Sequence, residues 1–188
     1  NKPGIVATNL LITQRPPEDL KAWITNGSDE LPAYGAVLSK EEIESLIDFI
    51  VATRDGRLPR PEAIWTLSEG TPGNYRLNPG ANVERGHELY TDKCSGCHGD
   101  DGTAMSFDGG EYSLGSHARQ KAYEDWFKIV NGQPGTKMVR FVQGDGKAMA
   151  QETLDILAAL CDRKKYPRGA ATGTEVPDAD PRCGAYLK

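Results

Sequence analysis

Apolar side chains recur at helical spacing in the first third of this chain. Ser39 and Glu42 stand at the spacing of a capping box, which predicts that a helix begins there. The apolar face of this helix consists of Ile43, Leu46, Ile47 and Ile50. A shorter helix is predicted over residues 18–25, because the stop signal Asn26-Gly27 follows it. Its apolar residues are Leu20, Trp23 and Ile24.

The second half of the chain carries three further helical patterns. Leu89 and Tyr90 follow Gly86 by three and four positions, so one apolar face includes a small residue that another helix can approach. Residues 118–130 form a second pattern, which ends before Gly132. Residues 151–161 form a third, with a broad apolar face. Together these patterns predict an all-α fold.

Composition narrows the function classes. The chain has 188 residues, which suits one domain or two small ones, and 22 Lys+Arg stand against 27 Asp+Glu. The net charge of -5 disfavours a nucleic-acid partner. No apolar stretch approaches the roughly 20 residues of a membrane helix, so the chain is not expected to span a membrane. Its first residues, Asn1 to Gly4, lack signal-peptide features, which indicates a cytoplasmic or an already processed protein.

The most informative stretch is Cys94-Ser95-Gly96-Cys97-His98, which has the C-x-x-C-H spacing of covalent haem attachment. Two thiols on one helical turn can add to the vinyl groups on one edge of a haem, and the next imidazole then lies beneath the iron. A redox C-x-x-C pair has no need of the following His. A zinc site needs a second ligand pair, and Cys161 and Cys183 are poorly spaced for one.

The surroundings of this motif resemble a bacterial class I cytochrome c domain. The resemblance rests on three stretches, residues 84–102, 126–138 and 151–161, and covers roughly residues 82–161. It implies a class I cytochrome c fold, in which the first and last helices cross around a single haem c bound through Cys94 and Cys97, with His98 as one axial ligand.

The second axial ligand has five candidates: Met105, Met138, Met149, His87 and His117. The first of these follows His98 too closely to reach the opposite haem face. For His87 we expect a solvated helix residue, for His117 a surface or capping role, and for Met149 a core position. Met138 lies in an extended loop forty positions after His98, as the resemblance implies, so it is the preferred ligand, with Met149 and His117 as alternatives.

Two departures from the family pattern concern the iron ligands. Val139 follows Met138 where the family commonly has proline. No proline lies between His98 and Pro134, although many family members use a Gly-Pro pair there to present a carbonyl to the proximal imidazole. We therefore expect another carbonyl, in residues 107–114, to accept the Nδ1 proton of His98.

The two remaining cysteines are predicted to form a disulfide. Cys161 lies near the end of the last helix, and Cys183 lies in a tail rich in Pro, Gly, Ala and Thr that could not order itself by burial alone. The alternative is a pair of reduced thiols. Disulfides persist outside the cytoplasm, where the resemblance also implies that c-type haem is attached, so a periplasmic or otherwise exported protein is predicted.

Residues 1–80 resemble a partial repeat of the same family. The helix over 18–25, the turn that follows and the helix after Ser39 are similar to residues 124–160, with Leu31 in the place of an axial methionine and no attachment motif upstream. This favours a degenerate, haem-free cytochrome half, and the alternative is an unrelated helical extension. The predicted divisions are a helical region (1–53), a Pro/Gly-rich linker (54–81), a haem domain (82–162) and a tethered tail (163–188). Trp65 and Tyr75 indicate that the linker packs against something.

The side chains outside the haem motif form no convincing active site, so the function follows from the haem. His98/Met138 ligation leaves no open iron position and favours a one-electron carrier that is not an enzyme and that exchanges electrons with redox donor and acceptor proteins. One alternative is a haem subunit docked on a larger oxidoreductase. Another is a haem enzyme or sensor with a displaceable ligand. Lys137 and Arg140 near the methionine loop predict an acidic patch on a partner.

Overall fold

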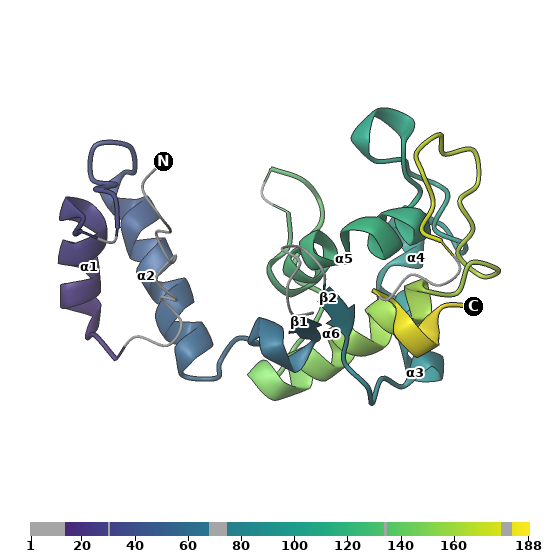
Figure 1. Ribbon diagram of the computed structural model, residues 1–188, viewed down its shortest axis with the longest axis horizontal. Helices are drawn as coiled ribbons and strands as arrows, with labels where there is room; N and C mark the ends of the chain where they lie inside the picture. Colours follow the sequence, from purple (N-terminus) through teal and green to yellow (C-terminus); the bar gives the residue numbers. More distant parts are fainter. Residues whose placement is uncertain (1–13, 30, 68–74, 134, 178–181) are drawn as a thin grey trace. The chain divides into compact units, whose positions relative to one another are not determined.

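The computed structural model describes residues 14–29, 31–67, 75–133, 135–177 and 182–188 (Figure 1). The chain divides into two compact units, with the boundary between Leu58 and Pro59. This boundary falls inside the segment predicted as a linker. Each unit has helices and a core of its own.

The first unit is a pair of helices, α1 (Pro17–Asn26) and α2 (Lys40–Arg54). Ser39 and Glu42 form the predicted capping box: the Glu42 backbone N–H donates to Ser39 Oγ at 3.1 Å, and the Ser39 backbone N–H donates to Glu42 Oε2 at 2.8 Å. Both predicted helices are confirmed. Their facing apolar residues form one core, made of Leu20, Ile24, Ile43, Ile47 and Ile50.

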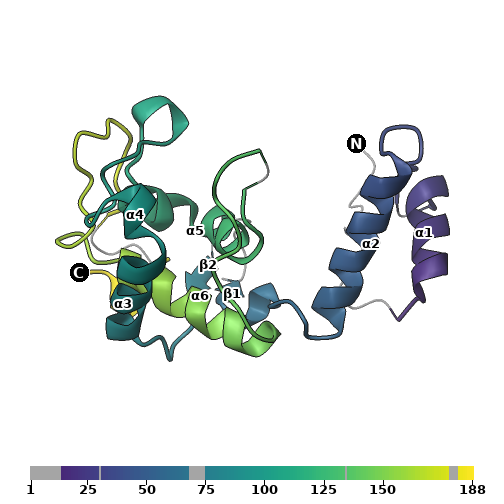
Figure 2. The same ribbon diagram turned by 180° about the vertical axis from the view of Figure 1, so that it is seen from behind.

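The second unit is built on α3 (Val83–Lys93), α4 (Ser95–His98), α5 (Leu114–Asn131) and α6 (Gly146–Leu160). Helix α3 packs across α6, as both ribbon views show (Figures 1 and 2). The closest approach is at Gly86, where a Cβ would lie 2.0 Å from the Asp155 carbonyl oxygen. A side chain there would force the two helices apart. The small residue predicted at a helix crossing therefore has that role, and the mainly α-helical cytochrome c fold is confirmed.

A small hairpin precedes α3. Strands β1 (Trp65–Leu67) and β2 (Tyr75–Leu77) are antiparallel, with Trp65 opposite Leu77, and the short helix η1 (Pro61–Ala63) leads into them. Trp65 is buried, and its ring meets that of Tyr75 edge to face at a centroid distance of 5.0 Å. These aromatic rings pack within the second unit, as their presence in a Pro/Gly-rich segment suggested.

Two helices begin earlier than the sequence predicted. α5 starts at Leu114 because Ser113 and Ser116 cap it reciprocally. α6 starts at Gly146 because Asp145 Oδ1 accepts the backbone N–H of Ala148 at 2.9 Å. Apolar periodicity marks the buried middle of a helix and is weaker at its polar first turn. Within the described ranges, no helix has both the length and the apolar character needed to cross a membrane.

The C-terminal tail folds back over the second unit. Its residues include Tyr166, whose side chain is fully buried, and the short helix η3 (Gly184–Tyr186). The backbone N–H of Leu77 in β2 donates to Arg182 O at 2.9 Å, so the tail extends the hydrogen bonding of the hairpin. Figure 1 shows this yellow segment beside α6 and α3.

Candidate functional site

Helix α4 places two free thiols and an imidazole on one turn. Cys94 ends α3 and caps α4, and the His98 backbone N–H donates to Cys94 O at 3.0 Å. Cys97 is exposed and Cys94 is half-buried, and both are free. Burial raises the pKa of Cys94 to about 11, so this thiol is protonated at neutral pH. The two sulfurs are thus available for thioether bonds.

The imidazole of His98 is held without a hydrogen bond. Its Nδ1 atom is buried and has no partner among the described residues. Burial lowers the pKa of His98, and the charge of Asp125 opposes this only in part. The ring is therefore neutral at neutral pH, which is the form that binds a metal ion.

The expectation that a carbonyl in residues 107–114 accepts the Nδ1 proton is not met. The loop carbonyls are engaged elsewhere: Phe107 O accepts the backbone N–H groups of Gly110 and Tyr112, and Tyr112 O accepts that of Phe107. Two more, Gly110 O and Glu111 O, accept N–H groups of the tail. Without a Gly-Pro turn, the loop folds on itself and on the tail instead of presenting an oxygen to His98.

An aromatic ring lies against His98 where the hydrogen bond was expected. Phe107 stacks on the imidazole with a centroid distance of 6.0 Å and an interplanar angle of 28°. The Phe107 ring also meets the ring of His117, at a centroid distance of 5.3 Å. Nothing in the sequence spacing pointed to Phe107, because its place next to His98 depends on the fold of the loop between them.

His117 has neither a surface nor a capping role, so that expectation is wrong. Its side chain is 2% exposed, and its Nδ1 lies 2.9 and 3.0 Å from the two carboxylate oxygens of Asp125. Its Nε2 is 4.0 Å from Asp108 Oδ2. Asp125 lies in the same helix as His117, eight positions later, and Asp108 lies in the loop before this helix. Apolar periodicity does not reveal such a polar pairing.

The expectation of a solvated His87 is wrong as well. The His87 side chain is buried, and its Nδ1 lies 3.2 Å from the hydroxyl of Tyr166 in the tail. Burial, with a contribution from Lys165, lowers its pKa. Met149 is buried in the core, as predicted, and Met105 is exposed.

The preferred second ligand, Met138, lies in the loop between α5 and α6 and is half-buried. Its backbone N–H donates to Thr136 Oγ1 at 3.1 Å, and its carbonyl accepts the Gln133 N–H at 2.8 Å. Helix α5 ends at Asn131 and is capped by Gly132, whose backbone N–H donates to Lys128 O at 2.7 Å. These local bonds fix a compact turn that carries the thioether.

The residues of this site fit a covalently bound haem. The observation that supports the fit is the buried, unpartnered Nδ1 of a neutral His98 directly after two free thiols. Cys94 and Cys97 would hold the porphyrin edge, and His98 Nε2 would face the iron. Within the described ranges, no cluster of three or more His, Cys, Asp or Glu side chains could hold a separate metal ion.

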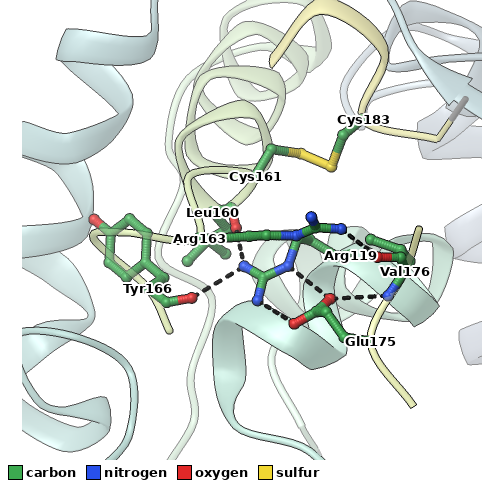
Figure 3. The surroundings of a disulfide bond; sticks show 8 residues. All are labelled: Arg119, Leu160, Cys161, Arg163, Tyr166, Glu175, Val176 and Cys183. Carbon is green, nitrogen blue, oxygen red and sulfur yellow. Dashed lines mark hydrogen bonds and ion pairs between the residues drawn. A yellow bond between two sulfur atoms is a disulfide. The ribbon is translucent and has the colours of Figure 1, made fainter. Parts of the chain in front are cut away.

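The predicted disulfide is present, between Cys161 and Cys183, with Cα atoms 5.9 Å apart. Figure 3 shows the Arg119 guanidinium in the surroundings of this disulfide, joined by hydrogen bonds to the end of α6 and to the tail. Arg119 donates to the carbonyls of Leu160 and Tyr166 at 2.9 and 3.0 Å and forms an ion pair with Glu175 at 2.6 Å. Sequence reasoning missed this ion pair, in which Arg119 is buried and Glu175 is half-buried, since the two residues are 56 positions apart.

A mainly α-helical unit in which α3 crosses α6, with two thiols and an imidazole on the turn after α3, has the features of a c-type cytochrome domain. Residues 81–159 match the family model described as cytochrome C oxidase, cbb3-type, subunit III. The match covers somewhat less than half of the chain and does not reach residues 1–80. Searches of curated proteins and of solved structures gave no match. A cytochrome c domain implies haem c binding and haem-based electron transfer with redox partners.

Proposed function

We infer that the chain is an exported, periplasmic one-electron carrier with one covalently bound haem c, ligated by His98 and Met138. The observation that carries this proposal is the arrangement of Cys94, Cys97 and His98 on one turn, with a half-buried imidazole whose buried Nδ1 has no hydrogen-bond partner among the described residues. When bound, the haem iron supplies the change between the ferric and ferrous states, which transfers one electron. Cys94 and Cys97 would attach it, and His98 and Met138 would ligate its iron.

Met138 is the favoured second ligand for a structural reason. Its neighbours Lys137, Val139 and Arg140 are exposed, whereas the Met138 side chain is half-buried. Thioether ligation favours the ferrous state and raises the reduction potential. A six-coordinate iron would leave no open position for a substrate, which supports a carrier and not an enzyme.

Export is supported by the disulfide between Cys161 and Cys183, because such bonds persist in oxidising compartments. Both sulfur-bearing residues are buried, which protects the bond from reductants. The same compartment is the one in which c-type haem is attached in the family that the chain resembles.

A second candidate is a haem subunit docked on a larger oxidoreductase. It is favoured by the description of the matched family, which names a subunit of an oxidase. In this case the first unit, which carries no cysteine or histidine, would serve as a docking or covering module. Exposed Lys137 and Arg140 would then face acidic groups on the partner, and salt would slow the encounter.

The number of haems is the first test. A pyridine haemochrome assay on the native protein should give one haem per chain, and Cys94→Ala/Cys97→Ala should lose covalent haem on a denaturing gel. Two haems per chain would contradict the assignment of a haem-free first unit. Retention of covalent haem in the double variant would contradict the attachment site.

The second ligand is tested by the weak red charge-transfer absorption of sulfur-ligated ferric haem. Met138→Ala should abolish this band, and Met105→Ala, which changes an exposed methionine, should keep it. A band that survives Met138→Ala would overturn Met138 as the ligand and leave one haem and its attachment untouched. Native mass measurement of the complex purified from its source membrane or periplasm decides between a carrier and a docked subunit.

A further inference from the structure

We propose that residues 167–175 of the C-terminal tail are a positioning element for His98: they hold the loop 107–113, and through it the ring of Phe107, against the imidazole. This inference rests on the proposed function, since His98 matters here as an iron ligand. It adds a role for the tail, which lies outside the segment that matches the cytochrome family model.

The Nδ1 atom of His98 is buried and lacks a hydrogen-bond partner among the described residues. A metal-bound imidazole is usually oriented by an acceptor at its other nitrogen. For His98 the described residues provide none at Nδ1, and the ring of Phe107 stacks on the imidazole. The orientation of His98 therefore depends on how firmly Phe107 is held.

Phe107 is held by its loop. Its backbone pairs with that of Tyr112 in both directions, with N···O distances of 2.8 and 3.3 Å. Between them lies the one-turn helix η2 (Asp108–Gly110), in which Asp108 and Gly109 have positive φ angles of 51° and 70°. A non-glycine residue with positive φ is disfavoured, so this loop needs outside support to keep its shape.

The tail supplies that support along the loop. The backbone N–H groups of Thr172 and Gly173 donate to Gly110 O and Glu111 O at 3.1 and 2.7 Å. Next to them, Ser113 Oγ donates to Pro167 O at 2.9 Å. Three residues of the loop, Gly110, Glu111 and Ser113, thus form hydrogen bonds with the tail backbone.

The tail in turn is anchored to the helices on both sides of this contact. Arg119 of α5 is fully buried and binds the Glu175 carboxylate with two hydrogen bonds, of 2.9 and 2.6 Å. Before the contact, Tyr166 is buried, and after it the disulfide joins Cys183 to the end of α6 (Figure 3). A tail fixed at both ends transmits the rigidity of α5 and α6 to the loop.

Gly173→Ala is the sharpest variant. The φ angle of Gly173 is not in the positive region, so alanine fits its backbone, but a Cβ would lie 2.6 Å from Glu111 O and 3.0 Å from the Tyr112 ring. The tail must then move away from the loop. The matched control is Tyr186→Phe, which removes hydrogen bonds of the tail to Asn78 O and to the N–H of Ala81 and leaves the loop untouched.

In the haem-loaded protein, we expect Gly173→Ala to shift the reduction potential and the hyperfine-shifted NMR resonances of the His98 ring, with full haem content. Tyr186→Phe should leave both unchanged. Amide exchange of Phe107 and Tyr112 should be about tenfold faster in Gly173→Ala, as expected from the loss of backbone hydrogen bonds. Phe107→Leu should shift the His98 resonances as well, and Gly173→Ala added to it should give no further shift.

Unchanged resonances and potential in Gly173→Ala, with faster amide exchange, would overturn the proposal, and equal shifts in Tyr186→Phe would assign the effect to general loosening. If Gly173→Ala does not fold, Glu175→Gln gives the same readouts by releasing the tail from Arg119. A wild-type protein without covalent haem would instead contradict the proposed function. In that case the amide exchange of the loop still measures whether the tail holds it.

Discussion

The hairpins α1–α2 and α5–α6 belong to different units, yet their first helices end in the same way. Gly27 caps the end of α1 and Gly132 caps the end of α5, with φ and ψ of 76° and -175° at Gly27 and 79° and -178° at Gly132. In each case the glycine N–H donates to the carbonyl four residues earlier, Trp23 O or Lys128 O, at 2.8 and 2.7 Å. This backbone conformation is essentially restricted to glycine.

The turns that follow these glycines also correspond. In the first unit, the Ser28 N–H donates to Leu31 O at 2.7 Å, and in the second, the Gln133 N–H donates to Met138 O at 2.8 Å. Leu31 therefore occupies the position of Met138, although its turn is two residues shorter.

A third bond closes each turn against its helix. The Tyr34 N–H donates to Ile24 O at 3.0 Å, and the Phe141 N–H donates to Ile129 O at 3.4 Å. Both acceptors lie three residues before the terminal glycine. Three equivalent hydrogen bonds support the hypothesis that the first unit is a degenerate cytochrome half, which no family match tests.

The difference between the two hairpins lies in the side chain that the turn presents. Leu31 packs against the core of the first unit, and an aliphatic side chain cannot ligate iron. Met138 carries a thioether, and its unit contains Cys94, Cys97 and His98. The same backbone turn thus occurs with and without a side chain that can ligate iron, and four comparisons of variants test this parallel.

The largest effect is expected from alanine at the two terminal glycines. In Gly27→Ala a Cβ would lie 2.6 Å from Ala33 N, and in Gly132→Ala it would lie 2.8 Å from Met138 O. Strain at positive φ and the backbone clash should together cost about 3 kcal/mol in each unit. Amide exchange of α2 and α6 reports the stability of each unit separately.

Gly56→Ala is the control for this pair, since Gly56 has φ of 74° but no atom within 4 Å of its Cβ position. It should cost about 1 kcal/mol, from backbone strain alone. If Gly27→Ala were no worse than Gly56→Ala, the tight turn in the first unit would not be needed, and the parallel between the hairpins would fail.

A second expected effect belongs to the α5–α6 hairpin alone. Arg119 ties α5 to the end of α6 and to Glu175, and the corresponding position before α1 is Gln14. Glu175→Gln should destabilise the second unit by about 2 kcal/mol, the value of a charge-assisted hydrogen-bond pair. The first unit should keep its stability in the same sample.

The pH dependence of this loss has a definite sign. Burial by itself would raise the pKa of Glu175, but its hydrogen bonds and charge pairing with Arg119 outweigh this, so the pKa lies below its ordinary value of 4.5. The stabilisation is therefore present above about pH 4.5 and is lost as the pH falls through the lowered pKa. Denaturant titrations at pH 7 and pH 3 should show wild type and Glu175→Gln converging at low pH. If the difference in the free energy of unfolding between the two proteins were the same at both pH values, the stabilisation would not come from the ion pair of Glu175 with Arg119.

The sequence was sufficient for the elements that depend on local chemistry. Ser39 and Glu42 predicted the start of α2, and the glycines at 27 and 132 predicted the ends of α1 and α5. The spacing of Cys94, Cys97 and His98 predicted that they share one helical turn, and they do. In each of these cases the partners lie within four positions, so the pattern contains the whole interaction.

The remainder depends on contacts between distant positions. His117 is buried against Asp125 and Phe107, and Gly173 of the tail is hydrogen-bonded to the loop. Neither contact can be predicted before the fold is known. A segment rich in Pro and Gly also gave no sign of the β1–β2 hairpin. A segment with few apolar residues cannot form a core of its own. It can still be ordered when it packs against the surfaces of other elements.

A smaller effect, of similar size in both units, is expected at the caps of the second helices. Ser39 caps α2, and Asp145 caps α6. Ser39→Ala and Asp145→Ala should each cost about 1 kcal/mol in its own unit. The measurement is amide exchange of the first turn of α2 and of α6 in both variants. A much larger loss in one unit would indicate that its cap has a second role that the other lacks.

The smallest effect is expected from Leu31→Met, which gives the first turn the side chain of the second. Leu31 is half-buried and methionine has a similar volume, so the cost should be about 0.5 kcal/mol. The haem content and the ferric charge-transfer band should stay as in wild type, because residues 1–80 contain neither cysteine nor histidine. The reciprocal Met138→Leu should lose the band while keeping the covalent haem. A second sulfur-ligated haem signal in Leu31→Met would mean that the first unit holds a haem site that lacks only a ligand. The hypothesis that this turn has lost all function in haem binding would then be wrong.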